Sequence, residues 1–284
     1  MSGGGDRHKA IGDPMNEPNQ IAPHHQRAIE KITGKFQADP QVVALLLAGS
    51  IAKGVQKDNS DVDVIVILTD EAIAQRQREN RLAECLFDLC DYKDGYADIK
   101  YFAKEFLFAA AERGSEPTRN SFIGARCLFT HDPEIEALVA RIPVYQLHEK
   151  ADKILSFYAG LALSSGFFWW EAQKRNDPYL RTRMVSEVVL FGCRLILAHN
   201  ERLFPCQKRL VEATDACPDK PANFRALLDA FLAASTDDNM LAFTKCITEF
   251  RDWGIGKDYS VPLTQYQHDH EQWWYLQRPY IAEW

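Results

Sequence analysis

The 284-residue sequence lacks several features that mark particular classes of protein. Its net charge is −7, so it lacks the excess of Lys and Arg that nucleic-acid-binding proteins usually carry. Its seven cysteines include no Cys-X-X-Cys pair, and their odd number and scattered positions favour reduced, buried thiols in a cytosolic protein over a structural zinc site. Because no basic stretch followed by an apolar core opens the chain, no secretory signal is expected.

Long hydrophobic runs are also scarce. Segment Ile154–Trp170 has no charged residue, but at about 17 residues it reaches only the lower limit of a membrane span. Three serines and two glycines interrupt it, so we interpret it as a buried core helix and expect no membrane association. We expect residues 1–20 to be a flexible tail, part of it added before a natural start at Met15.

What the sequence does contain is a distinctive pattern over residues 42–68. An apolar run, Val42–Ala48, precedes a glycine-containing connection, and a second run, 61–68, begins Asp-Val-Asp-Val. Both runs are typical of buried strands. Side chains alternate along a strand, so Asp61 and Asp63 share one face. Two carboxylates this close repel each other unless a cation lies between them, and oxygen ligands favour Mg²⁺.

The connection between these strands suits a phosphate-binding turn. Ser50 opens a short helical turn that ends near Gly54, and backbone N–H groups at a helix start are free to bind anionic oxygens. Gly49 permits the close approach that a Cβ would block. The Ser50 hydroxyl can donate to phosphate, cap the turn, or do both. Lys53 is placed to reach a triphosphate, and a solvated helix lysine explains it equally well.

This pattern resembles the DNA polymerase β-type nucleotidyltransferase superfamily, which carries an apolar strand, Gly-Ser or Gly-Gly, a later Gly, and Ser-Asp-X-Asp between hydrophobic residues. The sequence shows these elements in that order, ending at Ser60, Asp61 and Asp63. The family also needs a third carboxylate on a later strand, and Asp98, in Tyr-Ala-Asp-Ile-Lys-Tyr, supplies one. The resemblance is strong over residues 40–102 and weak beyond them.

The resemblance implies transfer of a nucleoside monophosphate, expected to be AMP, from an Mg-bound NTP such as ATP to a hydroxyl, with release of pyrophosphate. Asp61 and Asp63 would hold two Mg²⁺ ions, and Asp98 would complete one ion site and act as general base. Lys100 shares the strand face of Asp98 and would screen the carboxylates, touch phosphate or form an ion pair. Nucleotide contacts are expected from Gly49, Ser50, Lys53, Ser60 and Lys208.

Periodicity and chain breakers divide the sequence into a mixed and a helical part. Helices are expected at 22–38, 71–90, 103–113 and 133–140, and strands at 42–48, 61–68, 96–102 and 126–129, with a break at 115–117. Later helices are expected at 148–174, 179–200, 205–216, 221–234 and 237–252, followed by an irregular aromatic-rich tail from 254. We predict an α+β fold with a mixed-sheet nucleotidyltransferase domain (21–145) followed by an all-α helical bundle (146–284).

In the helical part, Asn200–Lys208 resembles the Asn-Glu…Pro-X-X-Lys pattern of some small bacterial nucleotidyltransferases, which would direct Lys208 towards the triphosphate; an exposed lysine explains it almost as well. The order of the domains is similar to aminoglycoside and lincosamide nucleotidyltransferases, which implies a small hydroxyl-bearing acceptor. The acidic composition suits a cationic one, and nucleic acid is not expected as a partner. The alternatives are a protein or RNA acceptor, as in toxin–antitoxin-type enzymes, and a nucleotide-binding regulator without turnover.

Overall fold

The computed structural model describes residues 20–284, and the chain divides into two compact units. The first unit runs to Gly114 and resumes over Thr118–Val144, and the second comprises Ser115–Pro117 and Tyr145–Trp284. The tail predicted for residues 1–20, with its start at Met15, lies outside the described residues except for its last position. No helix within residues 20–284 is long and apolar enough to cross a membrane.

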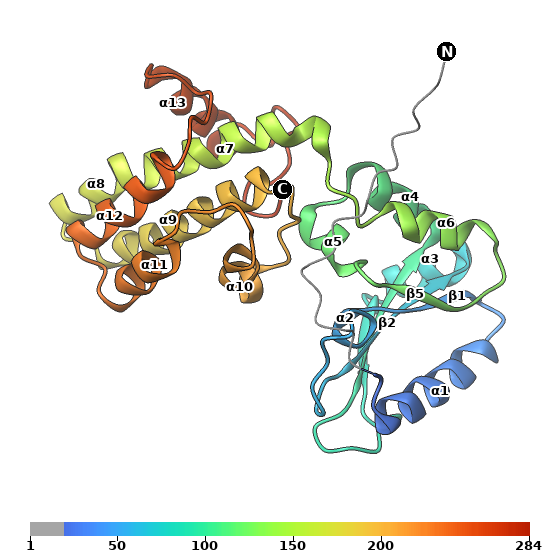
Figure 1. The fold of residues 1–284 in the computed structure, drawn as a ribbon. Helices are drawn as coiled ribbons and strands as arrows, with labels where there is room; N and C mark the ends of the chain where they lie inside the picture. Colours follow the sequence, from blue (N-terminus) through green and yellow to red (C-terminus); the bar gives the residue numbers. More distant parts are fainter. Residues whose placement is uncertain (1–19) are drawn as a thin grey trace, which may run out of the picture. The chain divides into compact units, whose positions relative to one another are not determined.

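The first unit is built on a mixed sheet (Figure 1). The sheet has five strands in the order β3-β4-β2-β1-β5. Strands β2 and β4 pair in parallel, and every other neighbouring pair is antiparallel. The parallel pair brings the starts of β2 and β4 to the same end of the sheet. The strands are β1 (Val42–Leu47), β2 (Val62–Leu68), β3 (Ala83–Leu86), β4 (Ala97–Ala103) and β5 (Arg126–Thr130).

Helices cover both faces of this sheet, which is why β1 and β2 are apolar almost without interruption. Leu45 and Val64 face the helices α1 and α3, whereas Leu46 and Ile65 face α4 and α6. The Thr69 side chain accepts a hydrogen bond from Ala72 N and so caps α3, as the sequence predicts. The helices are α1 (Pro23–Gln37), α2 (Gly49–Ala52), α3 (Asp70–Arg78), α4 (Lys104–Arg113), α5 (Glu116–Ser121) and α6 (Glu134–Arg141).

The second unit is helical, and α9 is its longest helix (Figure 1). Residues 191–198 of α9 are all buried, and they belong to the core of this unit together with Val188 and Val189. Asp177 caps α9 and Pro178 opens it, a favourable pair at a helix start. A π-helical segment, Ser164–Phe168, joins α7 to α8. The helices are α7 (Lys150–Leu163), α8 (Trp169–Lys174), α9 (Pro178–His199), α10 (Leu210–Asp215), α11 (Phe224–Ala233), α12 (Asp237–Thr248) and α13 (Ser260–Tyr266).

A buried cluster of charges lies within the second unit. The Glu116 carboxylate lies 3.0 Å from Lys153 Nζ and 3.3 Å from an Arg194 guanidinium nitrogen, and it accepts a hydrogen bond from Phe204 N at 2.9 Å. Lys153 also pairs with Glu149 at 3.1 Å. The side chains of Glu116, Lys153 and Arg194 are at most 2% exposed. We call these four charged residues the buried ion cluster.

The structure confirms the α+β class and corrects several predicted elements. The helix predicted over 71–90 ends at Arg78, because Asn80 adopts a left-handed conformation (φ 54°), and residues 83–86 form the edge strand β3 instead. The break predicted at 115–117 falls instead at Gly114 and Ser115, between the end of α4 at Arg113 and the start of α5 at Glu116. The tail predicted to be irregular contains α13, and the helix predicted from 205 begins only at Leu210.

Candidate active site

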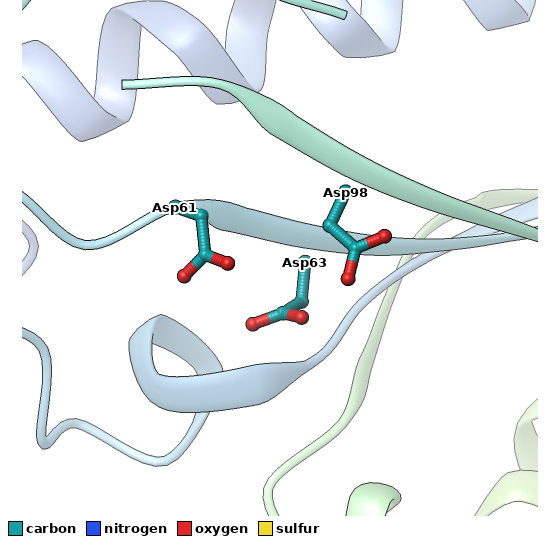
Figure 2. A group of neighbouring side chains, drawn as sticks. All are labelled: Asp61, Asp63 and Asp98. Carbon is teal, nitrogen blue, oxygen red and sulfur yellow. The ribbon is translucent and has the colours of Figure 1, made fainter. Parts of the chain in front are cut away.

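Three aspartates meet at the start of the parallel strand pair. Asp63 and Asp98 are direct register partners on β2 and β4, and Asp61 lies two residues before Asp63, just ahead of β2. One carboxylate oxygen from each of the three residues lies within 4.8 Å of the others (Figure 2). The three carboxylates predicted from the sequence therefore come together, and we call them the triad.

The triad is electrostatically strained. Burial, followed by the negative charge of Asp61, raises the pKa of Asp63 from 3.8 to about 6, and Asp98 adds to the effect while Lys100 and Lys53 oppose it. A hydrogen bond with Asp61 is the main cause that raises the pKa of Tyr96 to about 12. Lys100 Nζ lies 3.0 Å from Asp98 Oδ2. Since carboxylates outnumber the nearby cations, the site favours binding of a further cation.

Gly49 packs directly against the triad. A Cβ at this position would lie 1.7 Å from Asp63 Oδ2, and the residue has a φ of 66°, so only glycine fits. Ala48 N donates a hydrogen bond of 2.9 Å to the Asp63 carbonyl, which holds the end of β1 beside the start of β2. The backbone at the start of α2 is thereby fixed against the carboxylates, as the predicted phosphate-binding turn requires.

Ser50 carries a buried hydroxyl without a hydrogen-bond partner among the described residues. A buried polar group left unpaired costs about 1–3 kcal/mol, so such a group usually meets an ordered water or a ligand. The alternative role as an N-cap is wrong, because Ala48 occupies the cap position of α2 and makes no side-chain cap bond. The unpaired hydroxyl and the carboxylate-only donor set both fit a site for a metal-bound polyphosphate.

The remaining predicted nucleotide contacts have different surroundings. Lys53 Nζ donates to Asn120 Oδ1 at 3.0 Å, and its charge reaches Asp63. The Ser60 hydroxyl accepts a hydrogen bond from Lys57 N at 2.9 Å, so it stabilises the turn before Asp61. Lys208 lies in an exposed 3₁₀ turn of the second unit, and its contact with a triphosphate stays a prediction.

Sequence reasoning missed residues that position the triad. Tyr96, which lies just before β4, hydrogen-bonds Asp61, and its position two residues before Asp98 is a usable signal in the sequence. His25 Nε2 and Tyr92 Oη lie 3.2 and 2.7 Å from the Ser60 carbonyl, so both fix the residue that precedes Asp61. These contacts join segments far apart in the chain, and no local pattern reveals them.

The match to a known protein family agrees with this geometry. Residues 30–110 match the family described as polymerase beta, nucleotidyltransferase, and this range includes the whole triad. A nucleotidyltransferase-like protein from Exiguobacterium sibiricum 255-15 is similar in structure, with a TM-score of 0.46 and 12% identity over 79% of this chain and 73% of that chain. No protein with a curated description matches the sequence significantly. The first unit of this chain therefore contains a nucleotidyltransferase domain of the polymerase β superfamily.

Proposed function

We propose that this protein transfers AMP from Mg-bound ATP to a hydroxyl of a small-molecule acceptor and releases pyrophosphate. The observation that supports this most is the approach of three carboxylate oxygens to within 4.8 Å of one another inside the matched domain. Gly49, packed so closely on Asp63 that no side chain fits, is the second support, because it holds the backbone at the start of α2 beside the acidic site.

The carboxylates fit hard divalent cations. Asp61 and Asp63 would hold two Mg²⁺ ions, and Asp98 would complete the site of one of them. Bound there, the ions would neutralise phosphate charge and make the acceptor hydroxyl easier to deprotonate. Ser50 and the Gly49 backbone would hold the β- and γ-phosphates, and further contacts are proposed for Lys53, Ser60 and Lys208.

In the proposed reaction, this chain supplies position and a base rather than a nucleophile. Asp98 takes the proton of the acceptor hydroxyl, whose oxygen forms a bond to the α-phosphorus. The bond from the α-phosphorus to the bridging oxygen of pyrophosphate breaks, and pyrophosphate leaves with the electron pair. The products are the adenylylated acceptor and pyrophosphate.

For the acceptor, we propose a small cationic molecule of the aminoglycoside class. The net charge of −7 supports an attractive field for such a molecule and opposes binding of a polynucleotide. We further propose that residues 21–145 form the catalytic domain and residues 146–284 a separate helical domain, in the order found in antibiotic nucleotidyltransferases.

The test is pyrophosphate release from each NTP with Mg²⁺, with and without a panel of aminoglycosides, lincosamides and a tRNA pool. Release that depends on ATP and on one small acceptor supports the proposal. Release that depends only on tRNA would move the acceptor to RNA. Mg-ATP binding in a thermal-shift assay without release for any acceptor would favour a regulator, and failure of every NTP to bind would overturn nucleotidyl transfer altogether.

A further inference from the structure

Strand β4 brings a positive charge to one side of the triad. Lys100 follows Asp98 by two residues and therefore shares its strand face. Its ammonium lies 3.0 Å from Asp98 Oδ2, while its side chain is 49% exposed and that of Asp98 is 27% exposed. The flexible side chain of Lys100 extends from the sheet, so its ammonium can move between Asp98 and solvent.

The influence of this ammonium extends to Asp63. Of the two lysines that lower the pKa of Asp63, Lys100 has the larger effect. Asp61 has a different partner, because it is hydrogen-bonded by the neutral phenol of Tyr96. The two sides of the triad therefore differ, with a cation on the side of Asp98 and an uncharged donor on the side of Asp61.

We propose that Lys100 is a tethered cation that occupies the Asp98 side of the triad until a divalent ion displaces it. This inference rests on the proposed function, in which Asp98 completes the site of one of the two ions. The two ion sites are then unequal. A divalent ion must compete with Lys100 for the site that Asp98 completes, whereas Lys100 does not compete for the other site. The sites fill in a fixed order, with the site of Asp61 and Asp63 first.

The competition follows from charge and reach. An ammonium and a divalent cation repel each other when both contact one carboxylate, so binding of the ion requires Lys100 to leave. Displacement of Lys100 costs little, because ion pairs between partly exposed side chains contribute little free energy. In the ion-free protein, Lys100 offsets part of the repulsion among three carboxylates. Lys100 is thus a positioning residue, with no role in the chemical step.

The test is a titration of Mn²⁺ into the nucleotide-free protein, with the free ion followed by electron paramagnetic resonance. In Lys100→Met, the weaker Mn²⁺ site is expected to tighten about fivefold, while the stronger site changes less than about twofold. Lys100→Arg keeps the charge but offers a forked, bidentate partner to Asp98, so the weaker site should loosen about fivefold. Lys35→Met, on an exposed position of α1, makes the same change in net charge and should alter neither site.

The arginine variant separates competition from a general field, since a field alone would leave Lys100→Arg unchanged. Two results would overturn the inference while leaving the proposed function intact. One is an equal change in Mn²⁺ affinity at both sites in Lys100→Met, and the other is an unchanged Mn²⁺ affinity of the weaker site in Lys100→Arg. A second site visible only in Lys100→Met supports the inference. If neither wild type nor any variant binds Mn²⁺ or Mg-ATP, the proposed function itself fails, and the inference fails with it.

Discussion

The two units each contain a cluster of charged side chains, and the two clusters are built in opposite ways. In the buried ion cluster, Glu116 meets Lys153 and Arg194, so opposite charges touch and all three side chains are at most 2% exposed. In the triad, three carboxylates lie together, partly open to solvent, and Lys100 forms an ion pair with Asp98 at 3.0 Å. One cluster pairs opposite charges, and the other gathers like charges.

This difference separates a structural role from a functional one. Burying a charge costs several kcal/mol unless a partner and hydrogen bonds compensate, and Glu116 has both. In the triad, Lys100 offsets only part of the repulsion, and burial together with the charge of Asp61 raises the pKa of Asp63. A fold keeps such a strained group only where the rest of the structure holds it, which is typical of binding and catalytic sites.

The largest expected effect lies in the triad. Asp63→Asn should abolish nucleotidyl transfer, a loss of roughly 10⁴-fold or more, because it removes a shared cation ligand. The free energy of unfolding should not fall, since the change also removes like-charge repulsion. The assay is pyrophosphate release with the acceptor found in the panel. Asp91→Asn, which removes a surface carboxylate paired with Arg27, is the control and should keep full activity. Activity within tenfold of wild type in Asp63→Asn would refute the assignment.

In the buried ion cluster, the same kind of change should act on stability. Glu116→Gln leaves Lys153 and Arg194 buried with less compensating charge, and about 3–4 kcal/mol of unfolding free energy should be lost. Urea unfolding followed by tryptophan fluorescence measures it. The matched control is Glu212→Gln, in an ion pair with Arg209 whose glutamate is 72% exposed, and it should cost less than about 0.5 kcal/mol. Equal losses in both variants would contradict the structural role of the cluster.

The sequence predicts these two clusters unequally well. Alternation along a strand places Asp61 and Asp63 on one face, and the family resemblance adds Asp98, whose pairing with Asp63 then follows from parallel register. Glu116 gave no such signal. It stands in a segment predicted as a chain break, and its partners lie on α7 and α9, so only the tertiary fold shows that it is buried.

The missed strand β3 has a related explanation. Residues 83–86 form a strand of only four residues that alternates between exposed and half-exposed positions, so the sequence predicts a continuation of the preceding helix instead. What makes them a strand is their pairing with β4, where Cys85 lies opposite Asp98. An edge strand depends on pairing with its neighbour more than on its own propensity, and the local sequence pattern does not show which strand will pair with it.

The strain in the triad should appear as a pH dependence of stability. Because the pKa of Asp63 is raised from 3.8 to about 6 in the folded state, the folded protein holds this proton more tightly than the unfolded chain. Its contribution to stability is full below about pH 4 and is lost as pH rises to about 6, a loss on the order of 3 kcal/mol in the ion-free protein. Urea midpoints in EDTA at pH 4.5, 5.5 and 7.5 measure it.

The matched variant isolates this single group. In Asp63→Asn the part of the pH dependence between about pH 4 and 6 should vanish, so wild type and variant should differ most at pH 7.5. Saturating Mg²⁺ should reduce the loss in wild type, because a bound cation favours the charged carboxylate. Identical pH profiles for the two proteins would show that Asp63 is not strained.

The smallest effect concerns one hydroxyl in each unit. Ser50 Oγ is buried without a partner among the described residues, whereas Ser165 Oγ in the second unit donates to Leu161 O at 2.7 Å. If the Ser50 hydroxyl donates to a phosphate of bound ATP, Ser50→Ala should weaken Mg-ATP binding about fivefold, because one hydrogen bond contributes about 1 kcal/mol. The free energy of unfolding should stay unchanged or rise slightly. Ser165→Ala should leave ATP affinity unchanged and cost up to about 1 kcal/mol of stability. Calorimetric titration with Mg-ATP and urea unfolding give both quantities for each variant. A Ser50 variant that loses stability but binds ATP normally would make Ser50, like Ser165, a part of the fold rather than of the site.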